Sequence, residues 1–76
     1  MNNPRRKRID AVIQKLEELS EELEALKEEE EEAYDNLPES LQESERGEAM
    51  QEAIENLDEA VSSIDDAIEY LQEAVG

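Results

Sequence analysis

The spacing of the large apolar residues is the feature of this sequence that most limits its fold. In each half of the chain they recur at alternating steps of three and four residues. This heptad pattern, with apolar residues at positions a and d, forms the helix-packing seam of a coiled coil. The first seam comprises Ile9, Val12, Leu16, Leu19, Leu23 and Leu26, and the second comprises Met50, Ile54, Leu57, Val61, Ile64, Ile68, Leu71 and Val75. The pattern predicts an all-α chain of two amphipathic helices.

A proline separates the two seams. Pro38 has no backbone N–H to donate and disfavours helical geometry at the residue before it, so the first helix is expected to end there. We predict a first helix over about residues 5 to 36 and a turn over residues 37 to 43 that contains one short helical turn. Ser44 is the expected N-cap of a second helix over about residues 44 to 75.

The two predicted helices match in length and in register. Each has about 32 residues and is ~48 Å long, so an antiparallel hairpin aligns them fully. If paired residue numbers sum to 80, every a position of the first helix lies opposite a d position of the second, as antiparallel packing requires. Ile9 then lies opposite Leu71, and Leu23 opposite Leu57. We therefore predict one domain, residues 1 to 76, folded as an antiparallel two-helix coiled-coil hairpin.

A lone hairpin of this size has a small core, because two helices cannot fully bury both seams. Alanine occupies position g of every heptad of the second helix, at Ala53, Ala60, Ala67 and Ala74, which lets another helix approach closely. Tyr70 lies outside the seam and belongs to the surface or to an interface. We expect self-association of two copies into a four-helix bundle. A monomeric hairpin and a hairpin that needs a different partner are the alternatives.

Charge is distributed very unevenly along the chain. The formal net charge is -17, from 24 acidic and 7 basic residues. Four of the basic residues lie in the segment from Arg5 to Arg8, so residues 9 to 76 contain all the acidic residues and carry -21. Over a ~48 Å hairpin this is one net negative charge per ~2.3 Å, against ~1.7 Å for duplex DNA. The two densities are of the same order.

The acidic residues of the first helix, together with the turn, are the candidate partner-binding residues. They are Glu17, Glu18, Glu21, Glu22, Glu24, Glu28, Glu29, Glu31 and Glu32, with Ser44, Glu45 and Arg46 at the turn. One interpretation is a solvated helix surface, since glutamate favours helices. A second is an electrostatic decoy that occupies a basic nucleic-acid-binding surface of another protein, and a third is recruitment of basic protein partners without mimicry.

The composition excludes most enzyme chemistry. The chain has no His, Cys, Trp or Phe, which removes the usual general base, the thiol nucleophile and zinc ligation by imidazole or thiolate. We therefore expect no catalytic residues, no cofactor and no dedicated metal site, because no calcium-binding loop pattern occurs either. No stretch approaches the ~20 apolar residues that span a bilayer, so we expect a cytoplasmic protein without a membrane partner.

The basic cluster from Arg5 to Arg8 and the polar turn each admit two interpretations. Basic arms bind nucleic-acid phosphates, but a hairpin places this cluster beside acidic residues and the carboxyl end of the second helix, which would neutralise it locally. Direct nucleic-acid binding would meet strong repulsion from the acidic remainder. At the turn, Arg46 either pairs with a nearby carboxylate or belongs to a binding site, and Gly47 is expected to weaken the second helix slightly.

The turn also carries a resemblance to known proteins. From Asp35 to Glu48 it reads Asp-Asn-Leu-Pro-Glu-Ser-Leu-Gln-Glu-Ser-Glu-Arg-Gly-Glu. With the basic start and the acidic helices, it resembles an uncharacterised family of small acidic helical proteins found in genomes, prophages and mobile elements of low-GC Gram-positive bacteria. The resemblance implies an accessory role in mobile-element biology, including interference with a host nucleic-acid-binding system. It supplies no activity and no site.

These observations favour a non-enzymatic acidic protein-interaction module. The more specific hypothesis is a mobile-element inhibitor that engages a basic nucleic-acid-binding surface in the manner of a DNA mimic. The alternative hypothesis is a structural or scaffolding homodimer with no inhibitory role.

Overall fold

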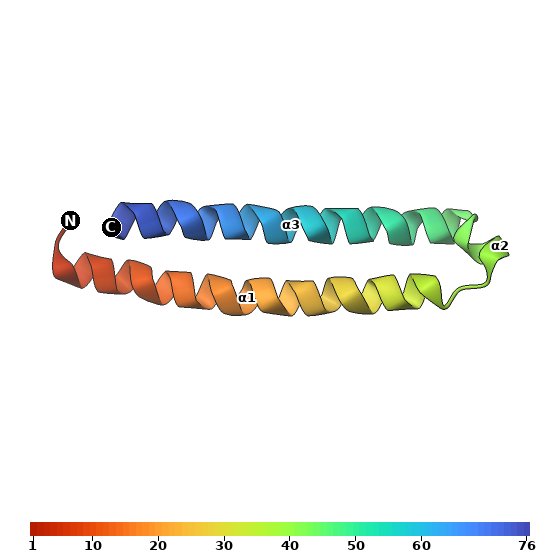
Figure 1. Cartoon of the computed structure of the whole chain (residues 1–76), viewed down its shortest axis with the longest axis horizontal. Coiled ribbons are helices and arrows are strands. Elements are labelled where there is room, and N and C mark those ends of the chain that lie inside the picture. Colours follow the sequence, from red (N-terminus) through yellow and green to blue (C-terminus); the bar gives the residue numbers. More distant parts are fainter.

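The structure, a computed structural model of all residues from Met1 to Gly76, consists of helices and contains no strand. Helix α1 spans Asn3–Asp35, the short helix α2 spans Glu39–Gln42, and helix α3 spans Glu45–Val75. Helices α1 and α3 run side by side in opposite directions, with α2 at the far end from both chain termini (Figure 1). The molecule measures 58 × 15 × 12 Å. The prediction of an all-α chain with a long, extended pair of helices is confirmed.

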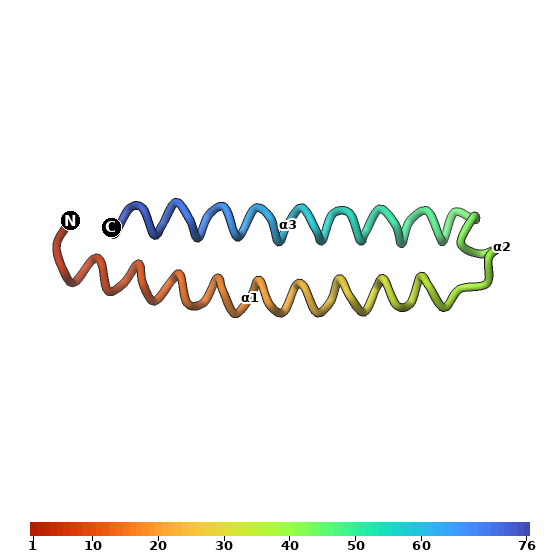
Figure 2. Tube along the Cα trace, viewed as in Figure 1, coloured from red at the N-terminus to blue at the C-terminus, as the bar shows by residue number.

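The helix ends follow local capping interactions. Helix α1 begins about two residues earlier than predicted, because the Asn2 side chain accepts a hydrogen bond from the backbone N–H of Arg5 at 2.9 Å. The connection between the long helices is short and tightly folded (Figure 2). Helix α2 lies within the predicted turn, and Ser44 is the N-cap of α3 as expected, its side chain accepting from the Gly47 N–H.

Helix α1 is rotated about its axis relative to the predicted seam. Its d positions, which were expected to pack against α3, are about half exposed: they are Val12, Leu19 and Leu26. The e positions are buried in their place, since Ile13 is 7% exposed and Ser20 is 8% exposed. In α3 the buried apolar side chain is that of Val61, at an a position, with 7% exposure. Val12, Leu19 and Leu26, which the heptad pattern places in the seam, are therefore packed less completely than Ile13 in this structure.

The remaining predicted packing residues are partly buried between the two long helices. They are Ile9, Leu16 and Leu23 in α1 and Ile54, Leu57, Ile64, Ile68 and Leu71 in α3. The rotation of α1 has a physical reason. It brings the large Ile13 side chain inside and places the polar e positions that follow where they can bond to α3.

Three side-chain hydrogen bonds join α1 and α3, and all three connect e positions. The pairs are Ser20 Oγ to Asp65 Oδ1, Lys27 Nζ to Asp58 Oδ1 and Gln51 Nε2 to Tyr34 Oη, each at 3.0 Å. The residue numbers of each pair sum to 85. When a and d positions pair at a sum of 80, the e positions of antiparallel helices pair at 85. The hydrogen bonds thus agree with the register expected from the apolar residues.

Gly47 is buried where the turn meets α3, and no side chain fits there. A Cβ atom at this position would run into the backbone carbonyl of Gln42. The Gln42 side chain in turn donates to the backbone carbonyl of Tyr34 at 3.0 Å, which ties the turn to the end of α1. The expectation that Gly47 merely weakens the helix is incomplete, because the glycine permits this close approach.

Substitution of Gly47 by alanine is expected to destabilise the chain, although alanine is the better helix former by ~1 kcal/mol. The added methyl group must displace the Gln42 backbone, and such overpacking costs about 1–3 kcal/mol. Thermal unfolding followed by circular dichroism measures the change. Glu48→Ala, at the exposed next position, is the control and should unfold close to the wild-type temperature. A more stable Gly47→Ala variant would contradict the packing at the turn.

Candidate functional site

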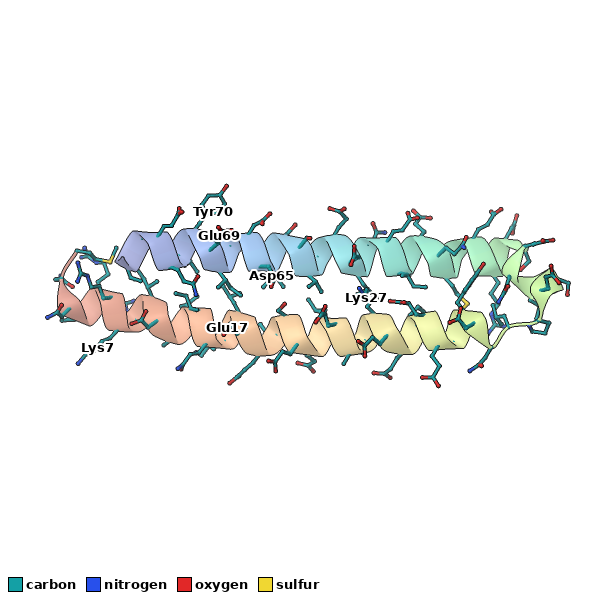
Figure 3. The ribbon with its side chains drawn as sticks, viewed as in Figure 1. Lys7, Glu17, Lys27, Asp65, Glu69 and Tyr70 are labelled. Atoms are coloured by element: carbon teal, nitrogen blue, oxygen red, sulfur yellow. The ribbon has the colours of Figure 1, made fainter.

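The nine glutamates of α1 that are candidate binding residues are all exposed. They occupy the b, c, f and g positions of the heptads, which cover the part of the helix that does not face α3. Carboxylates accordingly line the outer edges of the long helices (Figure 3). Glu30 differs from its neighbours, because it occupies an a position and is partly buried. The run from Glu28 to Glu32 therefore presents four carboxylates outward and directs one toward the helix pair.

Lys27 makes the only ion pairs in the molecule. Its Nζ lies 3.0 Å from Asp58 Oδ1 and 3.9 Å from Glu31 Oε1. The hydrogen bond to Asp58, with the charges of Asp58, Glu31 and Glu24, raises the pKa of Lys27 above its ordinary value. Lys27 lies between the two long helices and links them (Figure 3). This cation, absent from the predicted site, interrupts the acidic surface between the middle of the rod and the turn.

The stabilisation that comes from Lys27 is expected to vanish in strong alkali. Because its pKa is higher in the folded chain, the contribution is fully present below the pKa of an unfolded lysine, ~10.5. It is lost as the pH rises through the higher folded-state pKa. Thermal melts between pH 9 and pH 12 measure this effect. A Lys27→Gln variant should lose less stability over that range than the wild type, and equal losses would contradict the prediction.

The basic cluster from Arg5 to Arg8 lies at the end of the rod where the chain terminates (Figure 1). None of its side chains comes within 4.0 Å of a carboxylate, so no ion pair contributes to the local neutralisation expected here. The cluster nevertheless lies near the carboxyl end of α3, and its cations are therefore at the negative end of a helix dipole. A shallow hollow of about 420 Å³ lies here, lined by Arg5, Arg8, Ile9 and Val12.

At the turn, the three candidate residues have different roles. Ser44 is partly buried and acts in capping, since its hydroxyl also donates to the backbone carbonyl of Leu41. Glu45 and Arg46 are exposed. Arg46 has no carboxylate within 4.0 Å, which overturns the expectation that it pairs locally. Its guanidinium is thus free to contact another molecule.

A second hollow, of about 350 Å³, lies between the helices near the turn. Its lining combines carboxylates with a phenol and an apolar side chain and consists of Glu31, Tyr34, Asp35, Gln51, Ile54 and Glu55. The hydrogen bond from Gln51 to Tyr34 joins two of these lining residues across the helix pair. The separate sequence positions did not reveal this grouping. The pairing of e positions whose residue numbers sum to 85 would have indicated that Tyr34 and Gln51 lie together.

The chain matches no protein-family model, no curated protein and no solved structure. In the structure, no three acidic side chains are grouped so that they could hold a metal ion. Neither long helix contains an apolar stretch that could cross a membrane. The surface charge and the packing of the helices are therefore the observations on which a functional proposal depends.

Proposed function

We propose that this protein is a non-enzymatic acidic interaction module that binds a basic nucleic-acid-binding surface of another protein. The antiparallel helices form a coiled-coil hairpin, and two copies associate into a four-helix bundle. The charge of the chain supports the proposal: each chain carries -17 along a rod of 58 Å, so a bundle of two chains would present one net negative charge per ~1.7 Å. That is the linear charge density of duplex DNA, ~1.7 Å per charge.

The helical scaffold supports mimicry because it fixes where the carboxylates lie. Glutamates at fixed steps along α1 cannot spread apart as they would in a disordered acidic tail. A partner that binds the phosphates of a duplex through Lys and Arg meets an ordered array of anions, and it loses less conformational freedom on the side of this chain. The resemblance to acidic proteins of mobile elements makes a host nucleic-acid-binding protein the target class.

A competition assay tests the proposal. The protein is used to capture partners from a lysate of a low-GC Gram-positive bacterium, and each purified partner is then titrated with labelled duplex DNA. Saturation with the acidic protein should displace the DNA, and the displacement should weaken steeply with added salt. A partner that binds DNA normally while it is saturated with the acidic protein would contradict mimicry.

Charge-neutral variants locate the binding surface within the rod. The first variant replaces the four exposed glutamates of the run, Glu28, Glu29, Glu31 and Glu32, by glutamine. The matched control removes four charges from exposed positions of α3 through Glu48→Gln, Glu52→Gln, Glu59→Gln and Asp66→Asn. If only the first variant fails to displace DNA from the partner, the binding surface lies on α1. Equal losses assign it to the total charge of the rod.

A scaffolding homodimer without inhibitory activity is the second candidate function. The exposed apolar positions of α1, Val12, Leu19 and Leu26, favour it, because they need a covering partner whether or not a basic protein binds. Self-association with no effect on any nucleic-acid-binding partner would support this candidate over the first.

A further inference from the structure

The two sides of the helix pair are closed differently. On one side the e positions of α1 and α3 meet and form the three hydrogen bonds described above. On the other side, which we call the open face, no side-chain hydrogen bond or ion pair joins the helices. The open face includes the half-exposed Val12, Leu19 and Leu26 of α1. It also includes the c and g positions of α3, because g positions lie on the side opposite to the e positions.

The α3 part of the open face carries no charge. Its c and g positions from residue 49 to residue 74 are Ala49, Ala53, Asn56, Ala60, Ser63, Ala67, Tyr70 and Ala74. In a chain in which 41% of the residues are charged, this strip runs along most of the helix. It ends near Tyr70, which is 72% exposed and projects away from α1 (Figure 3). Depletion of charge is typical of the buried centre of an interface.

The charged residues beside the apolar row of α1 form a pattern that is complementary to the same pattern in an antiparallel second copy. Its g positions are, in order, Arg8, Lys15, Glu22 and Glu29, all exposed. Two cations are thus followed by two anions at intervals of one heptad. A second copy in antiparallel orientation brings Arg8 opposite Glu29 and Lys15 opposite Glu22. A parallel copy would instead place cation against cation and anion against anion.

The apolar row favours the same alignment. With antiparallel copies, Leu19 lies opposite Leu19 of the second copy, and Val12 lies opposite Leu26. The residue numbers of each apolar pair sum to 38, whereas those of each charged pair sum to 37. The two registers thus differ by one residue, or ~1.5 Å along the helix. One register therefore satisfies both sets of contacts. The hollow lined by Arg5, Arg8, Ile9 and Val12 then receives a carboxylate from the second copy.

The α3 helices fit the same arrangement. When α1 lies on α1 of the second copy, α3 lies on α3, and the intrachain sum of 80 places Val61 level with the two-fold axis beside Leu19. Ala60 then lies within ~3 Å, along the helix, of Ala60 of the second copy, and Ala53 lies within ~3 Å of the level of Ala67. Alanine at these positions lets the two helices approach closely. A face that is 58 Å long and 15 Å wide is also large enough for the ~800 Å² that each partner buries in a stable interface.

We propose that the open face binds a second copy of this chain in antiparallel orientation, with a two-fold axis passing beside Leu19. This inference rests on the self-association that forms part of the proposed function, and it adds the face, the orientation and the register. The carboxylates at the b, c and f positions of α1 remain exposed in both copies of this dimer, whereas Glu22 and Glu29 take part in it. Binding of a basic partner to the b, c and f positions therefore does not compete with dimerisation.

Disulfide trapping tests the orientation, because the chain has no cysteine of its own. In the proposed dimer, residue 12 of one copy lies beside residue 26 of the other and ~21 Å from its own equivalent. Under mild oxidation, a mixture of Val12→Cys and Leu26→Cys chains should form covalent dimers, whereas neither variant should do so alone. Leu19→Cys should link to itself. Gln14→Cys, at an exposed f position, is the control. Linkage of Val12→Cys chains to one another, or mixed linkage no faster than the control, would overturn the proposal.

Sedimentation of charge variants tests the register. Lys15→Glu should raise the dissociation constant of the dimer about tenfold, since it replaces two attractions by two repulsions across the axis. The double variant Lys15→Glu, Glu22→Lys should restore association. Lys7→Glu changes the net charge equally but lies at an f position that points away from α3 (Figure 3), so it should have a smaller effect. Equal weakening by Lys15→Glu and Lys7→Glu would overturn the register.

The outcomes separate this inference from the proposed function. A wild-type chain that sediments as a dimer but fails the disulfide test refutes the open face and leaves self-association intact. A chain that stays monomeric at high concentration refutes both the open face and the bundle. The DNA competition assay is read out independently of both results, although a monomeric chain would present only half of the charge density on which the comparison with duplex DNA depends.

Discussion

Replacement of Val61 by aspartate is expected to unfold the protein. Val61 is the buried apolar side chain of α3, at 7% exposure, and lies near the middle of the contact with α1. The change loses ~1.5–3 kcal/mol of apolar burial and places a charged carboxylate at a buried position. The chain is small, so its total stability lies near the lower end of the ~5–15 kcal/mol that domains have.

The helical signal in circular dichroism at room temperature measures this effect, and most of it should be lost. Ser62→Asp is a matched control, because it adds the same charge at the next, exposed position of α3. The control should retain its helicity. A Val61→Asp chain that melts like Ser62→Asp would refute the burial of this residue against α1.

Added salt is expected to stabilise the protein strongly. Carboxylates three and four residues apart on a helix lie ~5–6 Å from one another, and each like-charge pair costs ~0.2–0.5 kcal/mol. Helix α1 contains many such pairs between Glu17 and Asp35. The screening length falls from ~30 Å at 0.01 M salt to ~3 Å at 1 M, so most of this repulsion disappears. The gain is on the order of 3 kcal/mol, which corresponds to about 12–24 °C in Tm.

Thermal melts in sodium chloride from 0.01 to 1 M measure the gain. The variant with glutamine at Glu28, Glu29, Glu31 and Glu32 isolates the source, because it removes four exposed charges and leaves Glu30 in place. Its Tm should be higher in low salt and should rise less with added salt. A wild-type Tm that does not depend on salt would show that self-repulsion is not what limits the stability.

Local features of the chain were predictable because neighbouring residues decide them. The stop at Pro38 and the cap at Ser44 depend on the chemistry of one or two residues, and the structure has both where the sequence places them. The outward position of the Glu28–Glu32 carboxylates also follows from the heptads, with Glu30 as the inward exception. The candidate site was therefore foreseeable as a surface, while the hollow around Tyr34 and Gln51 was not.

The amino-acid sequence by itself determined that this chain forms two long helices with an acidic exterior, because heptad spacing and charge position are properties of each helix alone. Only the tertiary structure decided how α1 is turned. Periodicity cannot choose between Val12 at d and Ile13 at e, since both flank the same a positions, and the choice depends on which of them packs and bonds better against α3. That choice leaves Val12, Leu19 and Leu26 uncovered and so creates the open face. Close approach decided the role of Gly47 as well, because the Gln42 carbonyl reaches it only once the turn has folded.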